Sequence, residues 1–141
     1  MKTQMSRGRI RVFQRRLLSW YQVNQRRLPW RTTRDPYKIL VSEIMLQQTQ
    51  VDRVVPKYRE FLERYPTIEA LAKAKTAQLR QTWSPLGYNV RPLRLRRIAQ
   101  QIWRNRKGCI PDSYDGLVAM EGVGRYTAGA IASIAYGQPE P

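Results

Sequence analysis

The chain has 141 residues, of which 26 are Lys or Arg and 10 are Asp or Glu, so its formal net charge is +16. It has no His and a single cysteine, Cys109, which excludes an internal disulfide, a multi-cysteine metal site and His-activated nucleophiles. The length suits one domain, and without a long apolar run or a signal-peptide core we expect a soluble, cytoplasmic protein with no membrane partner.

Apolar residues recur at helical spacing along most of the chain, and no alternating strand pattern stands out. The sequence therefore predicts an all-α fold of roughly seven or eight short helices with tight connections. Thr67 and Thr76 are expected to cap the starts of two short helices. The other expected helices span residues 9–24, 36–48, 51–64 and 89–105, a short stretch from about residue 113, and residues 125–136.

The segment LVSEIMLQQTQ, residues 40–50, places the carboxylate of Glu43 among apolar residues. Asp35 can cap the start of this helix, and Pro36 suits its first position. If the face that carries Glu43 is internal, loss of water raises the pKa of its carboxyl group and makes it a proton donor near neutral pH. The alternative is a boundary residue whose carboxylate stays in water. The same-face neighbours of Glu43 are Ile39, Leu40, Leu46 and Gln47.

The stretch WSPLGYNVRPLRL, residues 83–95, has the composition of a turn followed by several Arg residues. Leu86 and Tyr88 flank Gly87 in this turn. Apolar or aromatic side chains on a loop can enter a base stack while nearby Arg residues hold the backbone of the nucleic acid. The alternative is that both side chains fill gaps in the core beneath the loop.

Residues 113–136 have the pattern of a helix-hairpin-helix. A short helix precedes Gly122, Val123 and Gly124, and a helix rich in small residues follows. Glycines allow the backbone to approach a ligand closely, and the free N–H groups at the start of the second helix attract phosphate. A lone Gly-x-Gly is also common as turn punctuation. Here the basic character of the chain favours the phosphate-binding interpretation.

The positive charge indicates a polyanionic partner. The Arg residues outnumber Lys and are spread from Arg7 to Arg125 rather than gathered in one tail. Arg suits bidentate phosphate contacts better than Lys does, so this distribution favours a folded basic face that binds nucleic acid. A basic protein of ribosomal type is the alternative, but 42% apolar residues, four Trp and eight Tyr indicate a real core.

Six motifs, in this order, closely resemble the adenine DNA glycosylases of the MutY type, within the helix-hairpin-helix glycosylase superfamily. They are LPWR at 28–31, DPY at 35–37, SEIMLQQTQV at 42–51, FLERYPTIEALA at 61–72, WSPLGY at 83–88 and GVGRYTAGAI at 122–131. The resemblance covers the chain from about Leu17 to its end. It implies a six-helix barrel over about residues 28–136, the hairpin at 113–136, and an N-terminal helix within residues 1–27.

The resemblance implies base excision repair: hydrolysis of the N-glycosidic bond of adenine mispaired with 8-oxoguanine or guanine, after base flipping. It also implies a monomer on double-stranded DNA, associated with the nucleoid. Glu43 matches the catalytic general acid, and Tyr126 is the second residue expected at the catalytic centre. Tyr126 stands where lyase relatives have a nucleophilic Lys, which disfavours a Schiff-base mechanism. Trp30, Arg31, Leu46 and Tyr126 match the adenine pocket; Gln48, Thr49, Leu86 and Tyr88 match the lesion-probing positions; Gly122, Val123, Gly124 and Arg125 match the phosphate-binding hairpin.

The chain also departs from the family pattern. The second catalytic carboxylate and the four cysteines of the family's [4Fe-4S] cluster would lie beyond Pro141, so we expect a catalytic core truncated before the cluster subdomain, with no metal or cofactor bound by these residues. The N-terminal helix would then lack the partner it has in the family, which exposes its apolar face. The unusual residues within the matched part are Pro85, Asn89, Pro92 and Glu121.

Two classes of function remain open from the sequence. The first is a glycosylase that uses Glu43 as an acid, with a thymine-mismatch glycosylase as a near variant. The second is a non-catalytic DNA-binding fragment that keeps the hairpin and the basic face.

Overall fold

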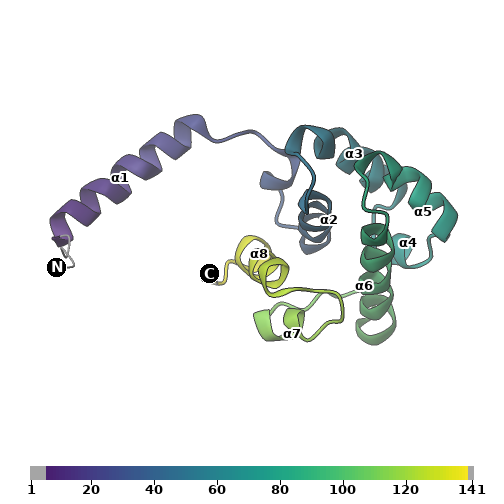
Figure 1. Ribbon diagram of the computed structural model, residues 1–141. Coiled ribbons are helices and arrows are strands. Elements are labelled where there is room, and N and C mark those ends of the chain that lie inside the picture. Colours follow the sequence, from purple (N-terminus) through teal and green to yellow (C-terminus); the bar gives the residue numbers. More distant parts are fainter. Residues whose placement is uncertain (1–5, 140–141) are drawn as a thin grey trace.

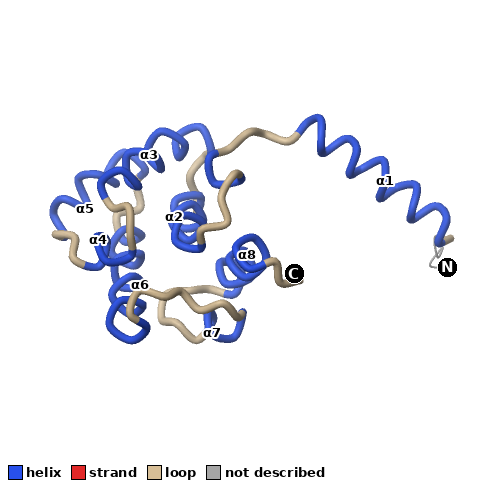
Figure 2. Tube along the Cα trace, turned by 180° about the vertical axis from the view of Figure 1, so that it is seen from behind, coloured by secondary structure: helices blue, strands red, loops and turns tan. Residues whose placement is uncertain are grey.

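The computed structural model describes residues 6–139, and this part of the chain is helical with no β-strand (Figures 1 and 2), which confirms the predicted all-α class. None of its helices is both long enough and apolar enough to cross a lipid bilayer. The α-helices and the 3-10 turns (η) are α1 (Arg7–Asn24), η1 (Pro29–Arg31), α2 (Pro36–Leu46), α3 (Val51–Arg64), α4 (Ile68–Ala72), α5 (Thr76–Trp83), η2 (Ser84–Leu86), α6 (Val90–Arg106), α7 (Tyr114–Val118) and α8 (Arg125–Tyr136).

Local capping explains where several helices begin. The side chain of Asp35 accepts a hydrogen bond from the backbone N–H of Tyr37 at 2.9 Å, with Pro36 in the first turn, as predicted. Thr67 caps α4 by accepting from the N–H of Ala70 at 3.1 Å, also as predicted. The predicted cap at Thr76 is wrong by one residue. Lys75 has the extended backbone of a cap, so Thr76 is already the first residue of α5.

Helix α2 lies at the centre of the helical body and packs against α3, α6 and α8 (Figure 1). Around it, α4 and α5 pack on α6, and α7 packs on α8. Aromatic rings fill part of the core: Phe61 meets Trp83 edge to face with ring centroids 5.7 Å apart. Pro92, one of the unusual residues, lies in the first turn of α6, where its missing N–H leaves no helical hydrogen bond unmade.

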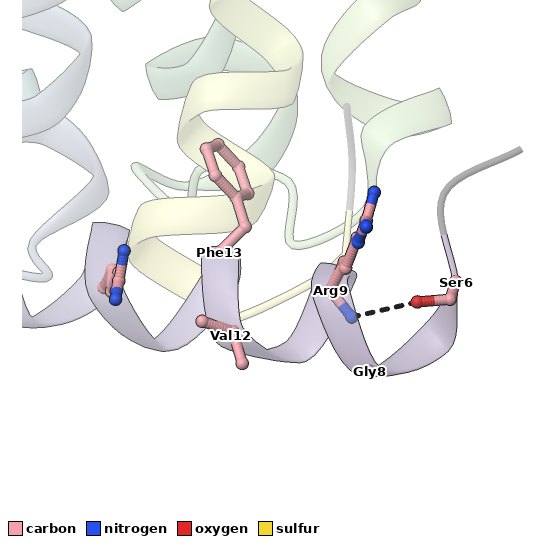
Figure 3. A pocket seen from close by; sticks show the side chains of 6 residues that line it. Ser6, Gly8, Arg9, Val12 and Phe13 are labelled. Atoms are coloured by element: carbon pink, nitrogen blue, oxygen red, sulfur yellow. Dashed lines mark hydrogen bonds between the residues drawn. The ribbon is translucent and has the colours of Figure 1, made fainter. Parts of the chain in front are cut away.

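Helix α1 extends away from the rest of the structure (Figures 1 and 2), and none of its residues is buried. Figure 3 shows Val12 and Phe13 on this helix beside a shallow groove, and the described residues that line it lie within residues 6–16. The exposed apolar residues of α1 include Ile10, Phe13 and Leu17. The apolar face of α1 is therefore exposed within the described residues.

The two phenylalanines of the chain offer a matched test of where the stability lies. Phe61 is fully buried, whereas Phe13 is 59% exposed. We expect Phe61→Ala to lower the free energy of unfolding by about 3–5 kcal/mol. Phe13→Ala should change it by no more than about 0.5 kcal/mol. Urea denaturation monitored by circular dichroism measures both, and equal losses would mean that α1 packs on the body in solution.

Candidate active site

A cleft of about 410 Å³ brings together residues from η1, α2 and α8, with the end of α1 on its rim. Its lining residues are Tyr21, Gln25, Trp30, Arg31, Ile39, Ser42, Glu43, Leu46, Tyr126 and Ile134. Five of these were singled out from the sequence, namely Trp30, Arg31, Glu43, Leu46 and Tyr126. Residues that lie 83 positions apart in the chain, Glu43 and Tyr126, thus line one cleft because α2 and α8 pack side by side.

Glu43 is the acidic residue among the described residues that line this cleft. It projects from the third turn of α2 and is partly buried. Burial raises the pKa of its carboxyl group above the usual 4.5. Within residues 6–139 the ion pairs are Lys57–Glu60 and Lys73–Glu69, so no cation holds Glu43 in its charged form. The carboxyl group is therefore suited to carry a proton and to donate it to a group in the cleft.

The walls of the cleft combine a fixed aromatic face with exposed polar groups. Trp30 is buried and packs edge to face on Tyr58, with ring centroids 5.3 Å apart, which fixes the orientation of its indole. The guanidinium of Arg31 is exposed and donates to the carbonyl of Arg26 at 3.2 Å. Tyr126 is 81% exposed in the first turn of α8. A planar aromatic group with a basic atom would fit these surroundings.

Four lining residues that the cleft needs were missed from the sequence. Ile134 follows Tyr126 on α8 by a little more than two turns, a spacing that could have placed it on a nearby face. Ser42 is buried, and its hydroxyl donates to the carbonyl of Ile39 at 2.8 Å. Tyr21 and Gln25 come from α1 and its end, and no periodicity in the sequence indicates that this end lies beside α2.

The two segments expected to probe DNA, residues 48–49 and 86–88, lie next to each other, but their side chains differ in exposure. The hydroxyl of Thr49 is 3.5 Å from the carbonyl of Leu86, which joins the segments. Gln48 and Tyr88 are exposed, and both have positive φ, 56° and 50°. Leu86 is 3% exposed and belongs to the core. The core-filling alternative therefore holds for Leu86 in this conformation and not for Tyr88.

The predicted helix-hairpin-helix is formed by α7, the turn and α8. Gly122 has φ +89°, and a Cβ atom there would lie 3.2 Å from the side chain of Arg94 on α6. Gly124 precedes α8 without a side-chain cap, so the first N–H groups of that helix, beginning with exposed Arg125, have no helical partner. Val123 does not fit the expected phosphate site. Its side chain is buried, and its backbone N–H donates to the carbonyl of Met120 at 3.2 Å.

Glu121, the unusual residue before the hairpin glycines, is held through its backbone. Its N–H donates to the side-chain oxygen of Gln101 at 3.2 Å, and its carbonyl accepts from the amide of the same side chain at 2.9 Å. The carboxylate itself is exposed beside the hairpin. A negative charge at this position opposes phosphate binding at the start of α8.

The residues of this chain do not fit an iron-sulfur cluster. Such a cluster is held by about four cysteine thiolates, and the chain has one cysteine, Cys109, which is exposed. Among residues 6–139, no group of three or more His, Cys, Asp or Glu side chains is arranged to hold a metal ion.

The described residues form an all-helical fold with a helix-hairpin-helix and a cleft that contains a half-buried carboxylate. These features define the class of helix-hairpin-helix DNA glycosylase folds. Residues 41–138 match the family described as HhH-GPD superfamily base excision DNA repair protein. The chain therefore belongs to this superfamily.

Similar proteins with an assigned activity include both adenine and thymine glycosylases. The chain is 43% identical over 138 residues to an adenine DNA glycosylase of Rattus norvegicus, a match that covers 92% of this chain and 27% of the rat protein. It is 41% identical over 139 residues to a thymine-DNA glycosylase of Aeropyrum pernix, covering 97% of this chain and 62% of that protein. The solved structure of a thermostable thymine-DNA glycosylase superposes with a TM-score of 0.85 at 30% identity, covering 91% of this chain and 59% of the other.

Substitution of Glu43 should stabilise the fold at neutral pH. A carboxyl group whose pKa is higher in the folded than in the unfolded protein contributes stability at pH values below its pKa in the unfolded protein. This contribution is lost as the pH rises through its pKa in the folded protein. Glu43→Gln cannot undergo this loss, so we expect a higher Tm than wild type at pH 7 and a difference that shrinks below pH 4.5. Thermal melts across this range measure the effect. Glu63→Gln, at an exposed position on α3, is the control and should show no such trend.

The two hairpin glycines should respond differently to alanine. Gly122→Ala must accommodate a Cβ atom at positive φ and close to Arg94, which should cost about 1–3 kcal/mol of unfolding free energy. Gly124 has φ −79° and open space where a Cβ atom would lie, so Gly124→Ala should cost less than about 1 kcal/mol, through the loss of a preferred N-cap residue. Urea denaturation of both variants tests this, and similar losses would contradict the geometry of the turn.

Proposed function

We propose that the chain forms the acid-bearing half of a DNA glycosylase site that acts on adenine mispaired with 8-oxoguanine or guanine. The observation that carries the proposal is the position of Glu43, whose carboxyl group is half-buried, without a cationic partner, and faces a cleft walled by Trp30 and Tyr126. Adenine is planar and has ring nitrogens that accept a proton. The chain spans about a quarter of the length of the rat relative. The activity of the whole protein is therefore part of this proposal.

In the proposed reaction, the adenine leaves the base stack and enters the cleft, where Glu43 donates its proton to a ring nitrogen. Protonation allows the base to accept the electron pair of the C1′–N9 bond, and positive charge develops on the sugar. Water then adds to C1′ and loses a proton. Among residues 6–139, no Lys lines the cleft, which supports hydrolysis rather than a Schiff-base lyase reaction.

The sugar cation needs a negative charge near it, and Glu43 is the one acidic side chain among the described residues that line the cleft. After giving up its proton, Glu43 can supply part of this stabilisation. No second carboxylate of the kind that the family resemblance implies lines the cleft within residues 6–139. Turnover by these 141 residues should therefore be slow, and a DNA-binding role without chemistry is the alternative at this site.

Two separate features of the structure support DNA binding. The exposed residues Gln48 and Tyr88 are available to contact bases, and the free N–H groups at the start of α8 are available to a phosphate. Because one copy of the chain carries the cleft, the probing residues and the hairpin, we propose a monomer on double-stranded DNA. The corresponding location is the nucleoid in the cytoplasm.

Removal of thymine from a mismatch is a second candidate. It is favoured by the Aeropyrum pernix thymine-DNA glycosylase, which matches 97% of this chain at 41% identity. Adenine is preferred here because Glu43 suits protonation of a basic ring nitrogen, and thymine has no comparable basic site.

The decisive measurement is single-turnover base release from duplexes that hold adenine opposite 8-oxoguanine, adenine opposite guanine, or thymine opposite guanine. We expect wild type to release adenine slowly, and Glu43→Gln to lose at least about 100-fold in rate while binding DNA with unchanged affinity. Release of thymine alone would replace the adenine assignment with the second candidate. Binding without release of any base would reduce the function of this chain to DNA recognition.

A further inference from the structure

Arg91, near the start of α6, is a buried cation that the proposed reaction does not use. Its side chain is 6% exposed. One guanidinium nitrogen, Nη1, donates to three carbonyls at the end of α2, those of Ile44 at 3.2 Å, Met45 at 2.9 Å and Gln47. Carbonyls in the last turn of a helix lack helical partners and carry partial negative charge, so α2 offers this cation both acceptors and a favourable field.

The other terminal nitrogen of Arg91, Nη2, reaches the two segments expected to probe DNA. It donates to the hydroxyl of Thr49 at 2.8 Å and to the carbonyls of Leu86 and Gly87, both at 3.2 Å. A single planar guanidinium therefore joins residues 44–49 to residues 86–87. Lys could not replace it, because an ammonium group lacks the fork that serves two sets of acceptors at once.

The charge of Arg91 has no carboxylate partner within residues 6–139. Besides the carbonyls, its guanidinium lies near the rings of Trp83 and Tyr88, with centroids at 5.5 Å and 5.4 Å. Burial, followed by the neighbouring charge of Arg94, lowers the pKa of Arg91 from its usual value. A buried cation without a counter-ion is costly, so this arrangement persists only while its many acceptors stay in place.

The contacts of Arg91 flank two strained residues. Gln48 and Tyr88 have φ values of 56° and 50°, in the left-handed region that residues with a Cβ atom disfavour. Arg91 binds the carbonyl before Gln48 and the hydroxyl after it, and it binds the carbonyl that directly precedes Tyr88. Strained backbone is kept where the surroundings fix it, and such sites are often functional.

We propose that Arg91 is a positioning residue that holds Gln48 and Tyr88 in one preformed unit, so that both side chains meet a mispair together without first being ordered. The inference rests on the proposed function, because it assigns the unit to recognition of the mispaired bases. Arg91 itself is buried, so its guanidinium is not available to a DNA phosphate. Preorganisation of this kind improves discrimination between a mispair and a normal pair. The free energy of binding does not have to offset the entropy lost on ordering the two segments.

Arg91→Lys tests the proposal by separating discrimination from general DNA affinity. The probes are two otherwise identical duplexes, one with adenine opposite 8-oxoguanine and one fully paired. We expect the ratio of the two affinities to fall about tenfold or more. Affinity for the paired duplex and its dependence on salt should stay unchanged, because no phosphate contact is removed. Arg97→Lys, at an exposed position of the same helix, is the control and should keep the wild-type ratio.

A wild-type affinity ratio in folded Arg91→Lys would overturn the proposal, as would equal losses on both duplexes with a reduced salt dependence. Native-state hydrogen exchange of the wild-type protein decides the matter independently if the variant does not fold. The amide of Thr49 bonds to Leu46 and the amide of Gly87 bonds to Ser84. These two amides should show the same opening free energy and urea dependence, whereas independent openings would contradict a single unit.

The same experiments separate this inference from the proposed function. If the wild-type protein does not distinguish the two duplexes, recognition of the adenine mispair fails. The exchange of Thr49 and Gly87 then still reports whether Arg91 holds the two segments together.

Discussion

The burial of α2 is the constraint on which the rest of the structure depends. Its apolar residues occupy nearly every face of the helix, so it is stable only when other elements cover it on several sides. Helices α3, α6 and α8 provide this cover, and η1 also packs against α2. The strip that stays partly open carries Glu43. The acid-bearing cleft is therefore a consequence of packing: the acidic residue on a buried helix marks the side where packing is incomplete.

Helix α6 connects this packing to the surfaces available to DNA. Near its start, Arg91 closes the end of α2 and holds the segments that carry Gln48 and Tyr88. One turn later, the stem of Arg94 lies against the position of Gly122, and Gln101 holds the backbone before that glycine. The probing segments and the hairpin thus share one rigid support, so their spacing does not depend on the loops between them.

Local sequence patterns predicted the structural features that depend on residues close to one another in the chain. The caps at Asp35 and Thr67 and the helices themselves follow from side chains within one turn, and Glu43 stood out because its own helix is otherwise mostly apolar. The burial of Arg91 could not be predicted. An Arg followed by other Arg residues is ordinarily exposed, and its acceptors lie up to 47 residues away. For the same reason, the pattern did not separate Leu86 from Tyr88, since only tertiary packing decides which one enters the core.

The positive charge of the chain contributes to function in a different way than the fold does. Of the many Lys and Arg side chains in residues 6–139, only Lys57 and Lys73 are within ion-pair distance of a carboxylate. Most of the positive charge is therefore compensated by solvent and salt, and the folded state is subject to its own repulsion. A polyanion relieves that repulsion wherever it binds. The specific contacts must then come from groups that charge alone does not describe, namely the free N–H groups of α8 and the fixed pair Gln48 and Tyr88.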